Sequence, residues 1–417
     1  MDIGLSSAIQ AWLAGDLTEA NAWLDDYFFA RDEASRIGVE LRLSANADAD
    51  QIAAEIVSEG GAAEIITDGV IEAQVTLDTL AALAQSEAIM AIHRISRAIP
   101  TSLPSLSQAT PDGAPAGAIY TQGFDVLGIN AWHNANIRGS GIGIAVIDTG
   151  FNGLPAANTP ARANFSCLAN TTPLFGTVGT SNHGLNVIEI LCDIAPSSSV
   201  YMYRADSYST LAQAIAQARL NPNIQMIVIT LDLGVNNGPG DGSSGRAGAA
   251  GYDPNSDPYY QLAQARASGI PVISAAGNNQ TRSAAFTVKT PNNVKVAEVA
   301  IRATAGDQIR IGWNDWRGDL NGATLEDFSF ALRTSPGGTV IASVPASRSS
   351  ASVPPGAMLT VPNSGTCAVP NPCNLILDVT RAAGNAGDIV VQVQVVPVQV
   401  SGETQTANVG VTGVDAL

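Results

Sequence analysis

Basic residues are scarce in this chain, and so are the features that would bind nucleic acid or cross a membrane. Its 20 lysines and arginines are outnumbered by 37 aspartates and glutamates, which gives a formal net charge of −17. Nucleic acid is not expected as a partner, because phosphate binding requires clustered cations. No window of about 18 consecutive apolar residues occurs, so the sequence predicts no membrane span.

Metal ligands are scarce as well. Only three histidines are present and no cysteines follow a Cys-x-x-Cys pattern, so a zinc site is not expected. Residues 315–327 carry oxygen ligands of the kind that Ca²⁺ prefers but no complete loop motif, and we expect solvated surface there. The oxygen-bearing side chains are Asp315, Asp319, Asn321, Glu326 and Asp327. The sequence therefore predicts no metal site and no required cofactor.

The four cysteines fall into two local pairs, Cys167 with Cys192 and Cys367 with Cys373. Two disulfides are the simplest interpretation, and four buried free thiols are the alternative. Disulfides fit an oxidising compartment, so we expect an extracellular or periplasmic protein. Residues 1–15 lack the basic and apolar regions of a signal peptide, so either the export signal lies upstream of them or the protein stays inside the cell, and the cysteines favour the first.

With about 150 residues per domain, 417 residues predict two or three domains. Residues 1–35 are predicted to be an N-terminal helical segment, because apolar side chains recur at helical spacing. Residues 36–96 follow the order β-α-β-β-α-β, which predicts an α+β ferredoxin-like fold. Their first strand, residues 39–43, alternates apolar and charged side chains and is expected to be half-buried. Residues 97–122 are rich in Pro, Ser, Gly and Ala, which is typical of an exposed linker.

The character of the chain changes over residues 123–282. Apolar strand-like runs alternate with helical stretches there, which predicts an α/β domain around a parallel sheet. The predicted strands are 142–147, 200–203, 226–230 and 272–275, and the predicted helices are 184–191, 210–218 and 259–267. A ligand site in such a sheet lies beyond the carboxyl ends of the strands. Residues 283–417 instead carry short β-rich runs separated by turns, which predicts an all-β sandwich or jelly roll.

Three residues of the predicted α/β domain are candidates for chemistry. Asp148 follows its first strand and is followed by Thr-Gly; a helix cap or turn is the alternative role. His183 opens an apolar helix, and a core or surface histidine is the alternative. Asn278 comes just after the last predicted strand and could aim an amide N–H at a developing oxyanion, with a turn asparagine as the alternative.

The motifs around these residues are, in order, Val-Ile-Asp-Thr-Gly, His-Gly and Ala-Ala-Gly-Asn. This pattern resembles the subtilisin-like serine peptidases, whose triad runs Asp, His, Ser along the chain, and the resemblance covers about residues 36–282. It implies that Asp148 orients His183, that His183 is the general base and that Asn278 stabilises the oxyanion. It also implies that residues 36–96 are a prodomain that inhibits the enzyme intramolecularly.

The same resemblance implies a peptide or protein substrate that pairs with the main chain of an extended segment of the enzyme. The residues implied to line this groove and the primary specificity pocket are Leu233, Gly234, Ala275, Ala276 and Gly277. The implied activity is that of a serine-type endopeptidase.

The serine motif of the family is missing. It would be a Gly-Thr-Ser that opens a helix downstream of the asparagine, and no such motif occurs there. Gly-Thr-Ser at residues 179–181 lies directly before the histidine, and Ser243 and Ser244 come too early and lead into a Gly-rich loop. Some family members carry a β-domain between the Asn and Ser motifs. We therefore interpret residues 283–417 as such an insertion and expect the serine further downstream.

Two alternatives to an endopeptidase remain open. One is a non-catalytic relative that binds peptides or surfaces, since the given chain without its serine is expected to be inactive. The other is a carbohydrate- or surface-binding module, in which Trp313 and Trp316 form a stacking platform. Core tryptophans of a β-sandwich are the other interpretation of this pair.

Overall fold

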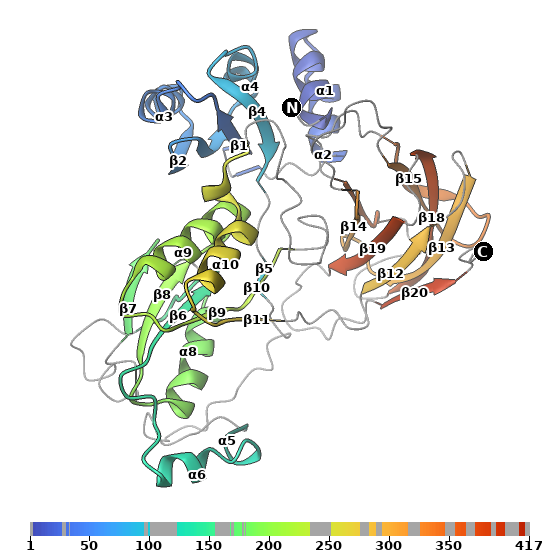
Figure 1. Cartoon of the computed structure of the whole chain (residues 1–417). Coiled ribbons are helices and arrows are strands. Elements are labelled where there is room, and N and C mark those ends of the chain that lie inside the picture. Colours follow the sequence, from blue (N-terminus) through green and yellow to red (C-terminus); the bar gives the residue numbers. More distant parts are fainter. Residues whose placement is uncertain are drawn as a thin grey trace. The chain divides into compact units, whose positions relative to one another are not determined.

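The structure is a computed structural model of the chain (Figure 1). It describes residues 3–26, 31–32, 34–95, 99–100, 123–154, 167, 171–176, 179, 181–233, 252–275, 283–288, 294–315, 326–346, 355–363, 372–384, 389–396 and 408–412. The chain divides into two compact units. The first unit comprises Met1–Ser96, Gly234–Pro254 and Asn279–Leu417, and the second comprises Arg97–Leu233 and Asn255–Asn278.

The N-terminal part of the first unit contains a four-stranded antiparallel sheet with the strand order β2-β3-β1-β4. Its elements are α1 (Ile3–Leu13), α2 (Leu17–Asp26), β1 (Ile37–Leu43), α3 (Ala49–Ser58), β2 (Ala62–Thr67), β3 (Val70–Val75), α4 (Leu77–Leu83) and β4 (Ile89–Arg94). All four helices contribute side chains to one apolar core with the sheet. Asp48 and Thr76 begin α3 and α4 by accepting hydrogen bonds from backbone N–H groups of the first turn.

Strand β1 differs from its prediction. All seven of its residues are buried, so the expectation of a half-buried strand was wrong. Val39 and Leu41 join the apolar core on one face. Glu40 and Arg42 are buried on the other face, where Arg42 Nη2 lies 2.7 Å from Glu40 Oε1. Each charge has an opposite partner, which is the condition for burying both.

The second unit contains the predicted parallel sheet, and this confirms an α/β core. The strand order is β11-β9-β6-β8-β7, and every neighbouring pair is parallel. The elements are β5 (Ile99–Pro100), α5 (Gly123–Val126), α6 (Ile129–Asn134), β6 (Gly143–Asp148), β7 (Thr171–Phe175), α8 (His183–Ile194), β8 (Ser199–Arg204), α9 (Tyr208–Leu220), β9 (Met226–Ile229), β10 (Leu231–Asp232), η2 (Pro254–Ser256), α10 (Pro258–Ala267) and β11 (Val272–Ser274).

Helices cover both faces of this sheet. Ala145 and Ile147 of β6 pack with residues of α9 and α10 on one face. Ile144 and Val146 pack with residues of α8 on the other. This two-sided burial explains why the strands are continuous apolar runs in the sequence. Among the described helices, none is long and apolar enough to cross a membrane.

A disulfide links Cys167 to Cys192 of α8, which confirms the first predicted pairing. Cys367 lies outside the described residues, so the structure provides no distance for the second pairing. No described cysteine is a free thiol.

The rest of the first unit is antiparallel. One sheet has the order β12-β19-β14-β17 and the other β16-β15-β18-β13-β20. The strands are β12 (Ser283–Val288), β13 (Val294–Ala303), β14 (Gln308–Trp313), β15 (Asp327–Arg333), β16 (Val340–Val344), β17 (Gly356–Thr360), β18 (Cys373–Ala383), β19 (Ile389–Val396) and β20 (Asn408–Thr412). Ile309 and Val393 from one sheet share an apolar core with Val299, Phe330 and Leu377 from the other, so the sheets pack face to face.

The structure decides between the two interpretations of Trp313. This residue is a core tryptophan and not part of an exposed platform, because it is 4% exposed, packs on Phe328 and donates its indole N–H to Glu326 O. Trp316 lies outside the described residues. Asp315 and Glu326 are buried, where solvated surface was expected. Glu326 is held by two hydrogen bonds of 2.8 Å from Arg381, and this pairing offsets the cost of burying both charges.

Candidate active site

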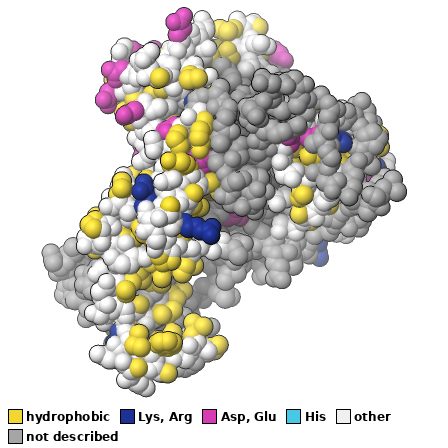
Figure 2. Space-filling view, in the orientation of Figure 1, with side chains coloured by type: hydrophobic (Ala, Val, Ile, Leu, Met, Phe, Trp, Pro, Cys, Tyr) yellow, Lys and Arg dark blue, Asp and Glu magenta, His cyan; other side chains and the backbone are white. Residues whose placement is uncertain are grey.

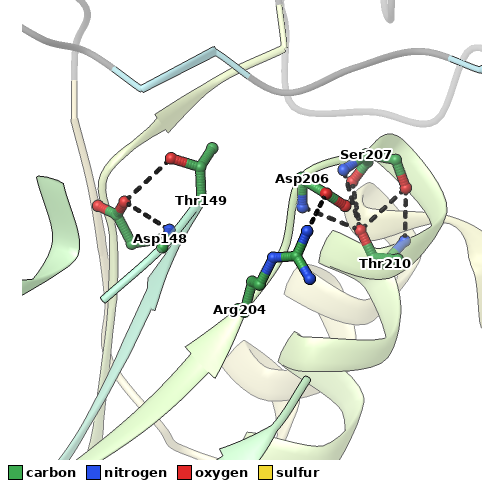
Figure 3. Close-up of polar contacts among 7 residues, drawn as sticks. Asp148, Thr149, Arg204, Asp206, Ser207 and Thr210 are labelled. Carbon is green, nitrogen blue, oxygen red and sulfur yellow. Dashed lines mark hydrogen bonds and ion pairs between the residues drawn. The ribbon is translucent and has the colours of Figure 1, made fainter. Parts of the chain in front are cut away.

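Asp148 is the last residue of β6, the middle strand of the parallel sheet, and its side chain is fully buried. The carboxyl ends of parallel strands meet at this edge, which is where α/β proteins place ligand sites. Its Oδ1 accepts long hydrogen bonds from Thr149 Oγ1 at 3.3 Å and from the backbone N–H of Gly150 at 3.4 Å (Figure 3). A buried carboxylate requires such donors, because burial removes its water.

His183 is the first residue of α8, and its ring contacts the other oxygen of the same carboxylate. Nδ1 lies 2.6 Å from Asp148 Oδ2, which is a short hydrogen bond, and hydrogen bonds that involve an ionised group are shorter than neutral ones. The backbone N–H of His183 donates to Ser181 Oγ at 3.1 Å, which fixes the start of the helix. The structure thus brings together two predicted site residues that are 35 positions apart in the sequence.

Two glycines allow this approach. The N–H of Gly184 donates to Gly150 O at 2.9 Å, which ties the first turn of α8 to the loop after β6. A Cβ on Gly184 would lie 2.5 Å from the Phe151 ring and 2.7 Å from Asp148 Cβ, and one on Gly150 would lie 2.5 Å from Ser181 O. A larger residue at either position would push the helix start away from Asp148.

The carboxylate also sets the protonation of the imidazole. The hydrogen bond to Asp148 raises the pKa of His183 above its ordinary value, and the negative charge of Asp148 adds to this increase. Burial of the ring opposes both effects by disfavouring the charged form. With Nδ1 donating to the carboxylate, the lone pair of the neutral ring is on Nε2, which can accept a proton.

Thr230 is a site residue that the sequence analysis did not identify. It directly follows β9, the strand beside β6, and its hydroxyl donates to Asp148 Oδ2. The sequence did contain a signal, because a polar residue at the carboxyl end of an adjacent parallel strand reaches the same edge of the sheet.

Arg204 ends β8, the strand on the other side of β6, and it pairs in register with Asp148. Its Nη2 donates to Asp206 Oδ2 at 2.6 Å, just before the capping box in which Ser207 and Thr210 begin α9 (Figure 3). This polar group stabilises the connection between β8 and α9 at the edge that carries Asp148.

Two of the residues implied to bind substrate are described. Leu233 follows β10 and packs partly against the core on the α9 and α10 face. Ala275 follows β11, is exposed, and donates its backbone N–H to Ile229 O at 2.9 Å. The other implied residues, Gly234, Ala276, Gly277 and Asn278, lie outside the described residues, so their roles stay predictions.

Strand β10 pairs antiparallel with β5, and Leu231 lies opposite Pro100 while Asp232 lies opposite Ile99. Both strands belong to the second unit. The pairing shows that the main chain just before Leu233 accepts an extended segment alongside it.

The sequence is similar to one curated protein, a subtilisin, but it matches no family model. It is 24% identical to subtilisin Savinase of Lederbergia lenta over 205 residues, which cover 46% of this chain and 66% of that protein. The chain therefore spans slightly less than two thirds of this relative's length.

Solved structures with similarity include two proteases. The Clostridium perfringens CspB protease matches with a TM-score of 0.29 and 13% identity, over 67% of this chain and 63% of that one. The epidermin leader peptide processing serine protease of Staphylococcus aureus matches with a TM-score of 0.31 and 16% identity, over 58% of this chain and 60% of that one. The sequence similarity to Savinase and the Asp148–His183 pair on a parallel sheet support a subtilisin-like family for this chain.

Proposed function

We propose that this chain carries the Asp–His part of a serine-type endopeptidase that acts on peptide or protein substrates. The observation that carries the proposal is the 2.6 Å hydrogen bond between His183 Nδ1 and the buried Asp148 carboxylate. In this role His183 Nε2 takes the proton of a serine hydroxyl as the serine attacks a peptide carbonyl. Asp148 holds the ring in the correct tautomer and stabilises the imidazolium that forms.

In the same proposal, Asn278 donates its side-chain amide to the oxyanion of the tetrahedral intermediate. The substrate main chain lies along β10 and Leu233, and Ala275 contributes to the opposite wall of the primary pocket. The antiparallel pairing of β10 with β5 supports this groove, because a substrate added as a strand uses the same main-chain groups.

We further propose that residues 36–96 act as an intramolecular inhibitor. Strand β5 comes shortly after this region in the sequence, and its pairing with β10 occupies the edge that a substrate strand would use. Replacing Ile99 with glycine should weaken this pairing, because glycine has low strand propensity. A fluorescent tetrapeptide should then bind the variant more tightly in an anisotropy titration, and equal affinity for both proteins would contradict the inhibitor role.

An open region on the parallel sheet supports a nucleophile supplied by a segment outside residues 1–417. Val146 lies opposite Val228, and Val228 lies opposite Ile273, so the three side chains share the face that α8 covers. Val146 is 0% exposed whereas Ile273 is 54% exposed, so α8 leaves the β11 end uncovered. Apolar faces of parallel sheets are covered by helices. We propose that a helix carrying the serine packs here.

The proposed location is extracellular or periplasmic, and the Cys167–Cys192 disulfide supports an oxidising compartment.

A fluorophosphonate probe tests the activity. Residues 1–417 should remain unlabelled, because no Gly-Thr-Ser motif follows Asn278 in this sequence to supply the nucleophile. A longer product of the same gene should be labelled at one serine and should cleave a fluorogenic peptide, and His183→Ala should abolish both signals. Stoichiometric labelling of residues 1–417 would contradict the proposed position of the nucleophile. A longer product that binds peptide without labelling would instead identify a non-catalytic relative.

A further inference from the structure

In the part of the chain that the structure describes, Asp148 Oδ2 receives two donors, His183 Nδ1 and Thr230 Oγ1, whereas its Oδ1 receives the two longer hydrogen bonds described above. The position of Thr230 is set by the sheet, because its backbone N–H donates to Ile147 O at 3.2 Å. The threonine hydroxyl is therefore placed by the same strand pairing that places the carboxylate.

Among the described residues, two acceptors lie within reach of the single proton on the Thr230 hydroxyl. Ile147 O lies 3.3 Å away, and Asp148 Oδ2 is the nearer of the two. A carboxylate oxygen is the stronger acceptor, so the proton is directed to Asp148. The hydrogen bond from Thr230 therefore restricts rotation of the Asp148 carboxylate group and keeps its Oδ2 pointing towards the imidazole of His183.

We infer that Thr230 is a positioning residue that holds the Asp148 carboxylate in line with His183 Nδ1. The inference rests on the proposed function, in which this pair is catalytic. Without the hydroxyl, Oδ2 loses one of its two donors and the carboxylate turns towards Thr149 Oγ1 and the N–H of Gly150. The hydrogen bond to His183 then becomes longer and less linear, and the histidine loses the main cause of its raised pKa.

The test compares Thr230→Val with Thr230→Ser by following the ring signals of His183 in an NMR pH titration. Valine has the shape of threonine without the hydroxyl, and serine keeps the hydroxyl. We expect Thr230→Val to lower the pKa of His183 by roughly 0.5–1 pH unit and Thr230→Ser to restore it to near the wild-type value. Thr149→Val is the matched control, since Thr149 contacts only the oxygen that faces away from the histidine, and it should shift the pKa by less than about 0.2 unit.

An unchanged or higher His183 pKa in a folded Thr230→Val protein would overturn the inference, as would equal shifts in the valine and serine variants. If the valine variant does not fold, Thr230→Cys decides the question, because its S–H is a weak donor of similar size. A lower pKa in that variant supports the role and an unchanged pKa refutes it. The readout needs no turnover, so it separates a failure of this inference from a failure of the peptidase proposal.

Discussion

Replacing Asp148 by asparagine tests the electrostatics of the site most directly. Asparagine keeps the shape of the buried side chain and removes its charge, while burial of the histidine ring continues to disfavour the imidazolium. Two unit charges about 4 Å apart interact by about 4 kcal/mol at an effective dielectric of about 20, and one pKa unit is about 1.4 kcal/mol. The upper limit is therefore about three units, and we expect the His183 pKa to fall by roughly 1–3 units, below its ordinary value.

The same substitution predicts a pH-dependent change in stability. A histidine whose folded pKa is raised stabilises the fold fully below its unfolded-state pKa and loses this effect as the pH rises through the folded pKa. In Asp148→Asn the folded pKa is lowered, so the sign reverses and protonation destabilises the fold. The difference in the free energy of unfolding between wild type and variant should therefore grow as the pH falls from about 8 to about 6.

The assay is an NMR titration of the ring signals of the three histidines, with His183→Gln to assign the signal, together with urea unfolding at several pH values. His133 serves as the internal reference, because its ring contacts Ile194 O and Phe124 and neither contact is altered. A His183 pKa in the variant equal to or above the wild-type value would refute the reasoning.

Three further predictions concern the framework of the site and of the β region. Arg381→Met leaves Glu326 buried without its cation and should cost about 3–5 kcal/mol in urea unfolding, whereas the double variant with Glu326→Leu should recover most of this loss. Gly184→Ala should cost roughly 1–3 kcal/mol and lower the His183 pKa, because the added methyl displaces the start of α8. Removing the Cys167–Cys192 disulfide, which closes a separation of 25 residues, should lower the free energy of unfolding by about 3.5 kcal/mol.

Each of these has its control. Gly69→Ala is matched to Gly184→Ala, since no atom lies closer than 3.9 Å to an added Cβ there, and it should leave the His183 pKa unchanged. A double variant at 381 and 326 no more stable than Arg381→Met would argue against an unpaired buried charge as the cause of the loss. Reductant should destabilise the wild type more than a Cys167→Ala/Cys192→Ala variant, which keeps the predicted Cys367–Cys373 pair, and equal sensitivity of both would refute the disulfide prediction.

The second unit also carries a group of exposed apolar side chains on its surface. Figure 2 shows apolar side chains gathered over α5 and α6, where Val126, Leu127 and Trp132 are 87%, 61% and 56% exposed. This region directly precedes β6 in the chain. Apolar side chains at this level of exposure are tolerated singly on a surface but are unusual as a group.

The sequence by itself determined the order of the elements and the candidates for the site. Apolar periodicity is a local property, so it predicted the helices and strands around β6, β8 and β9 and the alternation that makes a parallel sheet. The position of Asp148 after a buried strand and of His183 at a helix start was also local. Motif order then pointed to the subtilisin-like family, and the similarity to Savinase supports that assignment.

Only the tertiary structure decided which side chains meet. Thr230 and Asp148 are 82 positions apart, and Arg381 and Glu326 are 55 apart. No local pattern encodes such pairs, because they depend on strand order and register across the sheets. The burial of Glu40 and Arg42 was missed for the same reason. Alternation along a strand predicts that its charged side chains are exposed, and only the contact between the two charges explains why both are buried. Contacts made across strands, not the periodicity along them, therefore fixed the geometry around Asp148.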